Sequence, residues 1–407
     1  MSRIDYDVVV IGGGPAGAIA AEDLARQGID VALIDKAGRI KPCGGAIPPR
    51  LIRDFDIPDA WLVAKARAAR MLAPSGAAVD MPIEGGFVGM VDREHFDENL
   101  RARAAAAGAE RLTGTFESLG RREDGRLVLG YREPSAPGQA AESGAWRVLN
   151  ARYVIGADGA RSRVAELGLG QGHVKSVFAY HEIVESPAEG QNGFEGARCD
   201  VYYQGEVSPD FYGWIFPHGK CASIGVGSAQ KGFSLRSATG LLRQRAGLAG
   251  CRTLRREGAP IPLSPRKVWD DRRAIVLAGD AAGVVAPASG EGIYYAMLGG
   301  RLAANAVAEA LKTANSRALA QARRAFMADH GQVFFVLGML QHFWYRNDAR
   351  RERFVAMCAD PDVQYLTWQA YMNKTLVKAR PGAHLRIFLK DLGHLLGSPS
   401  RRLSPQR

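Results

Sequence analysis

The sequence lacks a disulfide framework, a metal-binding spacing and a membrane-spanning run. Its five cysteines are an odd number, widely spaced and without a C-x-x-C pair, which excludes a zinc site and fits a reducing compartment. The densest apolar stretch beyond the N-terminal region, 333–340, spans eight residues, whereas a membrane span needs roughly 20. Two acids and no basic segment precede the first apolar run, so no signal peptide is expected. We therefore expect a cytoplasmic protein without bound metal, either soluble or lying on a membrane surface.

Acidic residues are fewer than basic residues in this sequence. The 407 residues include 42 Asp and Glu against 53 Lys and Arg, and residues 346–407 alone hold 12 basic and 5 acidic side chains, a net of +7 out of +11. Three interpretations of this basic tail are open: a solvated helical surface, attraction to an anionic membrane, or nucleic-acid binding. No recognised nucleic-acid module accompanies the charge, so we expect no nucleic-acid partner.

The first part of the chain has the pattern of a dinucleotide-binding unit. A β-branched run over 6–11 predicts a buried strand, and an Ala-rich stretch over 18–27 predicts a helix. A G-x-G-x-x-G motif lies between them, at Gly12, Gly14 and Gly17. The first glycine permits the tight turn, the second lets the backbone approach a pyrophosphate, and the third lets the helix pack on the strand. The helix N-terminus offers free N–H groups to the phosphates.

An acidic residue follows the second strand of this unit. The strand predicted over 30–34 ends at Asp35, which lies 21 residues after Gly14, near the roughly 20 typical of the acid that binds a ribose 2′-hydroxyl. A carboxylate at this position would repel a 2′-phosphate. The motif therefore predicts bound FAD or NAD rather than NADP, and a glycine-rich turn without a ligand is the alternative.

Two later segments distinguish FAD from NAD. A buried strand precedes Asp158-Gly159, and another precedes Gly279-Asp280, a glycine-punctuated loop and a helix predicted over 293–311. These segments resemble the additional FAD fingerprints of the flavoprotein hydroxylase superfamily. The resemblance implies that Asp280 bonds the ribityl chain and that Asp158-Gly159 lies near the flavin and pyridine-nucleotide sites. The loop over 287–292 leads into a helix N-terminus, whose dipole would stabilise negative charge on reduced flavin.

Two further motifs narrow the family. The segment 41–45 reads K-P-C-G-G, and 209–217 reads P-D-F-Y-G-W-I-F-P. They resemble the K-P-C-G-G and P-x-x-Y-x-W-x-F-P motifs of the geranylgeranyl reductases, and the resemblance extends from Asp5 to about Gly397. It is strongest to the branch that serves chlorophyll and bacteriochlorophyll synthesis, with the archaeal lipid reductases as the close alternative. It implies a geranylgeranyl chain, free or esterified to a pigment, as substrate, and NADPH as a transient electron donor.

Three aromatic residues and one cysteine in these motifs are the candidates for substrate chemistry. Tyr212, Trp214 and Phe216 alternate, so a strand would project them to one face, where they form an apolar wall for a polyprenyl chain. An ordinary core-packed sheet face is the alternative. Cys43 lies in a turn, which the resemblance places beside the flavin, and a small buried hydrophobic residue is its alternative interpretation. We take Cys43, Tyr212 and Trp214 as catalytic candidates.

All the motifs together predict the full set of residues that bind the cofactor. These residues are Gly12, Gly14, Ala16, Gly17, Asp35, Lys36, Cys43, Gly44, Gly45, Ala46, Asp158, Gly159, Gly279, Asp280, Pro287, Gly290, Glu291, Gly292 and Ile293.

The segments together predict an α/β protein with a Rossmann-like FAD-binding domain, an inserted antiparallel-sheet substrate domain and a C-terminal helical region. The expected ranges are 1–75, 90–175 and 265–320 for the first, 76–89 and 176–264 for the second, and 321–407 for the third. Residues 134–144 are expected to form a hairpin loop and 385–396 a basic amphipathic segment that touches the membrane. The aromatic cluster over 334–344 is interpreted as core or as a cover of a prenyl tunnel.

Two other functions fit the same scaffold. One is an FAD-dependent monooxygenase, which would activate oxygen rather than reduce an alkene. The other is a non-catalytic prenyl escort resembling the Rab GDP-dissociation inhibitors, which share the fold but lack a working flavin site.

Overall fold

The computed structural model describes residues 5–36, 40–134 and 144–374, and the chain divides into two compact units. The first unit comprises Met1–Lys41, Arg93–Ser176 and Pro260–Phe334, and the second comprises Pro42–Asp92, Val177–Ala259 and Phe335–Arg407.

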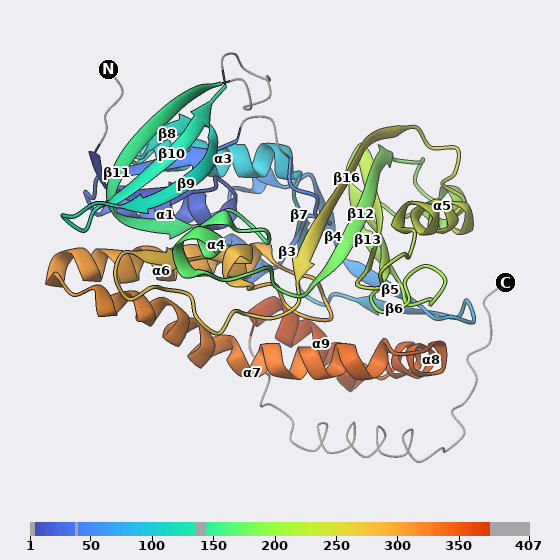
Figure 1. Ribbon diagram of the computed structural model, residues 1–407. Helices are drawn as coiled ribbons and strands as arrows, with labels where there is room; N and C mark the ends of the chain where they lie inside the picture. Colours follow the sequence, from blue (N-terminus) through green and yellow to red (C-terminus); the bar gives the residue numbers. More distant parts are fainter. Residues whose placement is uncertain (1–4, 37–39, 135–143, 375–407) are drawn as a thin grey trace. The chain divides into compact units, whose positions relative to one another are not determined.

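The first unit is built on a seven-stranded sheet with the order β8-β2-β1-β11-β10-β9 and with β17 beside β11. Figure 1 shows β9, β10 and β11 of this sheet side by side. Its strands are β1 (Asp5–Ile11), β2 (Val31–Asp35), β8 (Glu110–Thr113), β9 (Thr115–Arg121), β10 (Leu127–Glu133), β11 (Ala145–Gly156) and β17 (Ile275–Leu277). The strands β8, β2, β1, β11 and β17 are parallel neighbours, whereas β10 is antiparallel to both β9 and β11. Because parallel strands end at the same edge of a sheet, the turns after β1, β2, β11 and β17 gather there.

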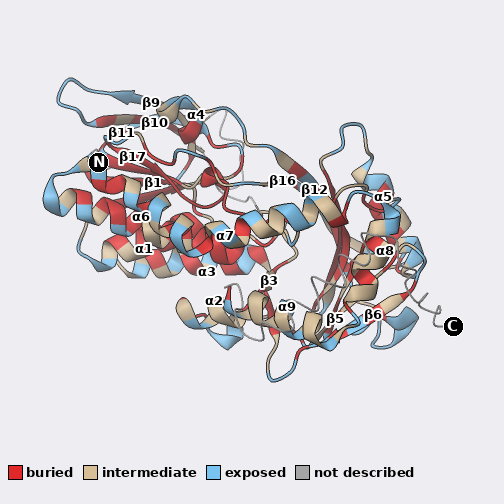
Figure 2. Cartoon of the chain, turned by 90° about the horizontal axis from the view of Figure 1, so that it is seen from below, coloured by how far each residue is buried: buried red, intermediate tan, exposed pale blue. Residues whose placement is uncertain are grey.

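Helices α1 and α6 pack against each other in this unit. The helical segments are α1 (Pro15–Arg26), α3 (Arg93–Ala106), α4 (Arg163–Leu169), η4 (Gly279–Ala282), α6 (Ile293–Thr313), η5 (Ser316–Ala320) and α7 (Gln321–Trp344) as far as Phe334. Both α1 and α6 carry long buried stretches (Figure 2). A Cβ on Gly300 of α6 would lie 2.1 Å from the carbonyl oxygen of Ala16, so only glycine permits this approach. Helix α1 begins three residues before the predicted 18–27, because Pro15 is compatible with a first helical turn.

The second unit contains a seven-stranded sheet with the order β16-β12-β15-β14-β13-β5-β6 and a three-stranded sheet β3-β7-β4. Its strands are β3 (Ala46–Ile47), β4 (Ala64–Ala66), β5 (Ala68–Leu72), β6 (Ala78–Pro82), β7 (Val88–Met90), β12 (Ser176–Glu185), β13 (Arg198–Tyr202), β14 (Gly213–His218), β15 (Cys221–Ser228) and β16 (Thr253–Pro262). Its helices are α2 (Pro49–Asp54), η1 (Asp59–Trp61), η3 (Gln191–Gly193), α5 (Leu235–Arg245), α8 (Asp348–Met357) and α9 (Pro361–Asn373). The central pairs are antiparallel, and only β5 and β13 are a parallel pair among the pairings given by register.

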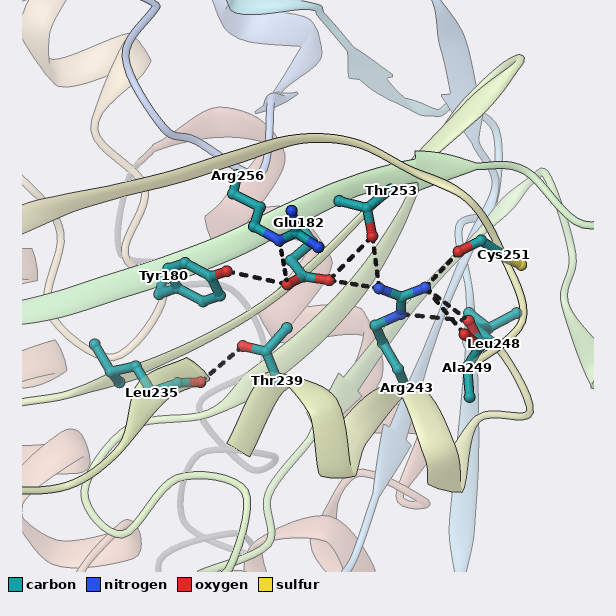
Figure 3. A network of polar contacts seen from close by, with 10 residues as sticks. All are labelled: Tyr180, Glu182, Leu235, Thr239, Arg243, Leu248, Ala249, Cys251, Thr253 and Arg256. Atoms are coloured by element: carbon teal, nitrogen blue, oxygen red, sulfur yellow. Dashed lines mark hydrogen bonds and ion pairs between the residues drawn. The ribbon is translucent and has the colours of Figure 1, made fainter. Parts of the chain in front are cut away.

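A polar network on one face of this sheet attaches α5 to the strands. Figure 3 shows the carboxylate of Glu182, on β12, between Arg243 of α5 and Arg256 of β16. The distance from Arg243 Nη1 to Glu182 Oε2 is 2.5 Å, and the Tyr180 hydroxyl donates to Oε1 at 3.0 Å. Burial favours the neutral acid, but hydrogen bonds from these partners outweigh it and hold the pKa of Glu182 below its ordinary value. The network therefore fixes β12 in place.

The observed division differs from the expected domain ranges most in two places, apart from shifts of one to five residues at other boundaries. Residues 42–75 were expected with the FAD-binding domain but lie in the second unit, because β5 pairs with β13 from Arg198↔Ala68 onward. The C-terminal helices do not form a region of their own. Phe326 packs on Trp269, at 5.3 Å between ring centroids, so the start of α7 belongs to the first unit.

The predicted surface segments lie partly outside the described residues. The expected loop over 134–144 connects β10 and β11, but 135–143 lie outside the described residues, as does the whole of 385–396. In the aromatic cluster of α7, Phe334 and Trp344 are buried, whereas Phe335 is 66% exposed. Within the described ranges, no helix combines the length and the apolar character needed to cross a bilayer.

Candidate functional site

Two of the motif glycines are required by the fold of the first unit itself. Gly12 has φ +101°, and a Cβ there would lie 2.4 Å from the carbonyl oxygen of Ala157, so β1 and β11 end in close contact. A Cβ on Gly17 would lie 1.8 Å from the carbonyl oxygen of Gly12, so α1 packs directly on the turn that precedes it. Any side chain at either position would separate these elements.

Gly14 is different, because nothing in the described chain requires glycine there. Its φ of −71° and ψ of −177° are extended backbone that any residue adopts, and a Cβ would meet no described heavy atom within 4 Å. Gly14 caps α1 without a side-chain hydrogen bond, so no side chain at the cap position takes up the N–H groups of Ala16 and Gly17 in the first turn, while Pro15 has no N–H. The arrangement fits a pyrophosphate held at a helix N-terminus and therefore fits FAD.

An arginine that the sequence did not single out lies beside this turn. Nη1 of Arg101, on α3, donates to the carbonyl oxygen of Gly13 at 3.0 Å and lies 3.3 Å from Oδ2 of Asp35. Burial raises the pKa of the Asp35 carboxyl, although the Gly13 backbone and Arg101 oppose the shift. Asp35 thus ends β2 beside the glycine turn, as predicted, and Lys36 follows it on the surface. Only the tertiary structure brings Arg101 to this place.

The side chain of Asp158 accepts hydrogen bonds from other residues of the protein. Its Oδ1 accepts from the Ser162 hydroxyl at 2.6 Å, and its Oδ2 accepts from the backbone N–H groups of Arg163 and Val164 at 2.7 and 3.1 Å. Burial raises the pKa of this carboxyl. Asp158 therefore ties the end of β11 to the first turn of α4, while Gly159, with φ +88°, continues the turn. A contact of this segment with flavin or pyridine nucleotide stays a prediction.

The turn that contains Gly279 and Asp280 packs against the first turn of α1, next to the G-x-G-x-x-G motif. Gly279 has φ +60°, and a Cβ there would lie 2.7 Å from Cβ of Ala16, so the end of β17 touches the first turn of α1. The next residue, Asp280, is 7% exposed and forms an ion pair with Lys41. A Cβ on Gly292 would lie 3.7 Å from Oδ1 of Asp280, which places this carboxylate near the N-terminus of α6. The turns that contain Gly12, Gly279 and Gly292 are therefore adjacent.

The loop before α6 completes the set of predicted residues in the first unit. Pro287, Gly290, Glu291 and Gly292 precede Ile293, the first residue of α6, and Gly290 has φ +64°. Gly300 was not predicted as a packing residue, although glycine inside a helical pattern is a signal of close packing. The remaining cofactor candidates, Cys43, Gly44, Gly45 and Ala46, belong to the second unit.

The three aromatic residues predicted to form a wall lie together in the second unit, and their contact with a prenyl chain stays a prediction. The rings of Tyr212 and Trp214 lie 6.1 Å apart at 67°, and those of Trp214 and Phe216 lie 6.4 Å apart at 41°. Tyr212 is 9% exposed and Trp214 is 6% exposed. The alternating pattern therefore places all three side chains together at β14.

The K-P-C-G-G loop contacts this wall. A Cβ on Gly44 would lie 2.8 Å from Cδ2 of Phe216 and 3.8 Å from Nε1 of Trp214. Nε2 of His218, at the end of β14, lies 3.1 Å from the Gly44 carbonyl oxygen. The backbone N–H of Gly45 donates to Sγ of Cys43 at 3.4 Å. The Cys43–Gly45 part of the first motif and the second motif, more than 160 residues apart in sequence, thus lie together in the second unit.

His218 is expected to make the stability of the folded protein depend on pH. Burial lowers the pKa of His218 to about 4 from its ordinary 6.5, despite the hydrogen bond to Gly44. Below pH 6.5 the unfolded chain takes up this proton and the folded chain does not, so stability falls as the pH drops to about 4, by up to ~3 kcal/mol. His218→Gln keeps an N–H donor for Gly44 and removes the titration.

We therefore expect urea unfolding midpoints of His218→Gln to depend less on pH than those of the wild type between pH 6.5 and 4. The matched control is His95→Gln, which removes an exposed imidazole of α3. Equal pH dependence of wild type and His218→Gln would contradict the assignment.

Comparisons with known proteins identify the family of the chain. Residues 6–179 match the family model of the pyridine nucleotide-disulphide oxidoreductases. The chain is 55% identical over 392 residues to geranylgeranyl diphosphate reductase of Rhodobacter capsulatus, covering 96% of this chain and 98% of that protein. It is 31% identical over 320 residues to digeranylgeranylglycerophospholipid reductase of Methanoculleus marisnigri, covering 75% and 77%. A solved geranylgeranyl bacteriochlorophyll reductase-like protein of Thermoplasma acidophilum has the same fold, with a TM-score of 0.78, 20% identity and coverage of 97% and 100%.

Proposed function

The chain belongs to the geranylgeranyl diphosphate reductase family of FAD-dependent oxidoreductases, and we propose that it reduces isolated C=C bonds of a geranylgeranyl chain to give the phytyl form. The contact of the K-P-C-G-G loop with the aromatic wall supports this proposal best, because it brings Gly44 against Phe216 and Trp214, next to the ring of Tyr212. The greater identity and coverage of the Rhodobacter relative favour the chlorophyll and bacteriochlorophyll branch over the archaeal lipid branch.

The chemistry of the alkene defines what the residues must do. An isolated trisubstituted alkene has no electron-withdrawing neighbour, so a proton must add to one carbon while hydride reaches the tertiary carbon. When bound and reduced by two electrons, the flavin of FAD would supply that hydride. The faces of Tyr212 and Trp214 would stabilise the cationic carbon by ~0.5–2 kcal/mol each. Their burial also keeps water away from a carbon that hydration would trap.

We propose Cys43 as the proton donor and Tyr212 as the second candidate. Cys43 lies in the loop that contacts the wall, and the Gly45 N–H that points at its sulfur would stabilise the thiolate left after proton transfer. The thiolate regains its proton from solvent before the next turnover. Full turnover by Cys43→Ala would assign the proton to Tyr212.

We propose NADPH as the source of the two electrons. The sequence contains no second G-x-G-x-x-G motif, so the family relationship supports a donor that binds only transiently. Each turnover would consume one NADPH and one proton and saturate one C=C bond. Rates of flavin reduction by NADPH and by NADH test this choice directly.

The decisive experiment is product analysis with purified FAD-loaded protein. Incubation with NADPH and either geranylgeranyl diphosphate or a geranylgeranylated pigment should add two hydrogens for each reduced bond, which mass spectrometry detects. The arm that gives product identifies the substrate form. Stoichiometric oxygen consumption with a hydroxylated product would indicate a monooxygenase instead. A colourless protein that binds the prenyl chain unchanged would indicate an escort.

We also propose peripheral association with an anionic membrane. Phe335, Met339 and Leu340 of α7 are 66%, 51% and 39% exposed, and the basic tail carries a net charge of +7 over 346–407. Each basic residue near an anionic surface contributes about 1 kcal/mol. Truncation after Gly382 should therefore weaken flotation with phosphatidylserine vesicles, most clearly at low salt. Unchanged flotation would favour the solvated-surface interpretation.

A further inference from the structure

A buried polar chain lies behind the aromatic wall, entirely within the second unit. Nε1 of Trp214 donates to Oγ of Ser223 at 3.1 Å, and the same oxygen lies 2.9 Å from Nδ1 of His181. Nε2 of His181 lies 2.8 Å from Oε2 of Glu257. Ser223 is 0% and His181 3% exposed, so these groups depend on one another rather than on solvent.

With a neutral imidazole at His181, one arrangement of protons satisfies every member of this hydrogen-bonded series. An indole nitrogen donates and never accepts, so the Ser223 oxygen is its acceptor. The single hydroxyl hydrogen of Ser223 is then available for Nδ1 of His181. His181 therefore carries its own hydrogen on Nε2 and donates it to Glu257. The hydrogen-bond direction thus runs from the indole toward His181 and from His181 toward Glu257.

The sheet is shaped to hold the indole against it. Trp214, Gly225 and His181 are register partners across β14, β15 and β12. A Cβ on Gly225 would lie 2.3 Å from Cζ2 of Trp214 and 2.6 Å from Cβ of His181. The indole therefore covers the backbone of Gly225, and its N–H ends at Ser223, two residues along the same face of β15. The backbone fixes one ring face, and the hydrogen bond fixes the rotation.

Glu257, the last residue of this hydrogen-bonded series, is also held in place. Nε of Arg255 lies 2.6 Å from Oε1 of Glu257, and Arg255 pairs in turn with Asp92 at 3.4 Å. The residue after His181, Glu182, is locked on the opposite face of β12 by the network of Figure 3. His181 therefore sits on a strand that is anchored from both faces.

We propose that Ser223 and His181 are positioning residues for prenyl reduction, which hold the Trp214 ring in the orientation that the alkene meets. This inference rests on the proposed function, but it assigns roles to two residues outside both family motifs. The proposal predicts that loss of the hydrogen bond frees the indole to rotate and lowers kcat/KM for the prenyl substrate without loss of FAD. An unpartnered buried N–H and a misplaced ring together would cost about tenfold.

The test compares Ser223→Ala with Ser228→Ala, which removes another buried hydroxyl from the same strand, one that donates to Asp210 at 2.6 Å. The ¹⁵N-indole resonance of Trp214, one of six, is assigned by its loss in Trp214→Phe. Ser223→Ala should shift this resonance and lower kcat/KM for geranylgeranyl diphosphate about tenfold. Ser228→Ala should leave both near the wild-type values.

A pair of His181 variants separates positioning from general destabilisation. His181→Asn places an amide oxygen near the position of Nδ1 and should retain the acceptor for Ser223 and most of the turnover. His181→Gln places its amide near Nε2 instead and should resemble Ser223→Ala. A shifted indole resonance with unchanged kcat/KM would overturn the proposal, as would an unshifted resonance in Ser223→Ala. Failure of the proposed function is distinct, because then the wild type itself would reduce no prenyl substrate.

Discussion

Gly14→Val should give a folded protein that purifies without yellow colour. The isopropyl group would occupy the open space before α1, where the backbone is expected to meet the pyrophosphate, and would repel it sterically. Steric overlap of this kind costs up to ~3 kcal/mol, so FAD affinity should fall about a hundredfold or more. The absorbance of the purified protein and titration of the flavin-free protein with FAD measure this effect.

Two other glycines make the Gly14 experiment specific. Gly120→Val on β9 is the matched control, because this position is also open and its strand tolerates a β-branched residue, so FAD content should be unchanged. Gly17→Ala should instead prevent normal folding, since its Cβ would lie 1.8 Å from the Gly12 carbonyl oxygen. Full FAD content in Gly14→Val would remove the pyrophosphate from this turn.

Trp214→Ala should lower kcat/KM for prenyl reduction by about a hundredfold while the protein keeps its FAD. The variant loses the central ring of the wall, and loss of a buried aromatic contact and of its cation–π stabilisation amounts to ~2–3 kcal/mol. The stability of the second unit should also fall by ~3–5 kcal/mol because a large side chain is removed from a buried site. Steady-state rates with each prenyl substrate and the flavin absorbance of the same sample separate the two effects.

Two controls distinguish a catalytic effect from unfolding. Trp214→Phe retains a ring and should keep more turnover than Trp214→Ala even though it lacks the N–H donor. Trp146→Ala removes a tryptophan that is 47% exposed on β11 and should leave the rate unchanged. Normal turnover by Trp214→Ala would return the wall to the role of ordinary core packing.

The local part of the cofactor site could be predicted from the sequence, because strand, turn and helix are contiguous there. The run over 6–11 is β1, and the acid at Asp35 ends β2 beside the glycine turn. The alternation of Tyr212, Trp214 and Phe216 also sufficed to place three rings together, since a strand has a fixed two-residue period.

The rest depended on contacts between distant segments. Residues 42–75 joined the second unit through the pairing of β5 with β13, which no local pattern indicates. Arg101 reaches the glycine turn only because α3 packs beside it. Ser223 and His181 are ordinary strand residues in the sequence, and their role becomes visible only when the register aligns them with Trp214. The side chain of Asp158 was linked to ligands by resemblance, whereas the structure shows that it binds backbone N–H groups of α4.

The hydrogen bonds and ring contacts described for Trp214 all arise from residues of one unit. Gly225, Ser223, His181 and the Gly44 loop belong to the same compact unit as the indole. The contacts that hold the indole therefore require no residue of the first unit. We therefore expect variants of this protein to fall into two separable groups. Variants of the first group lose FAD but keep the aromatic wall in place. Variants of the second group keep FAD but reduce prenyl substrates poorly.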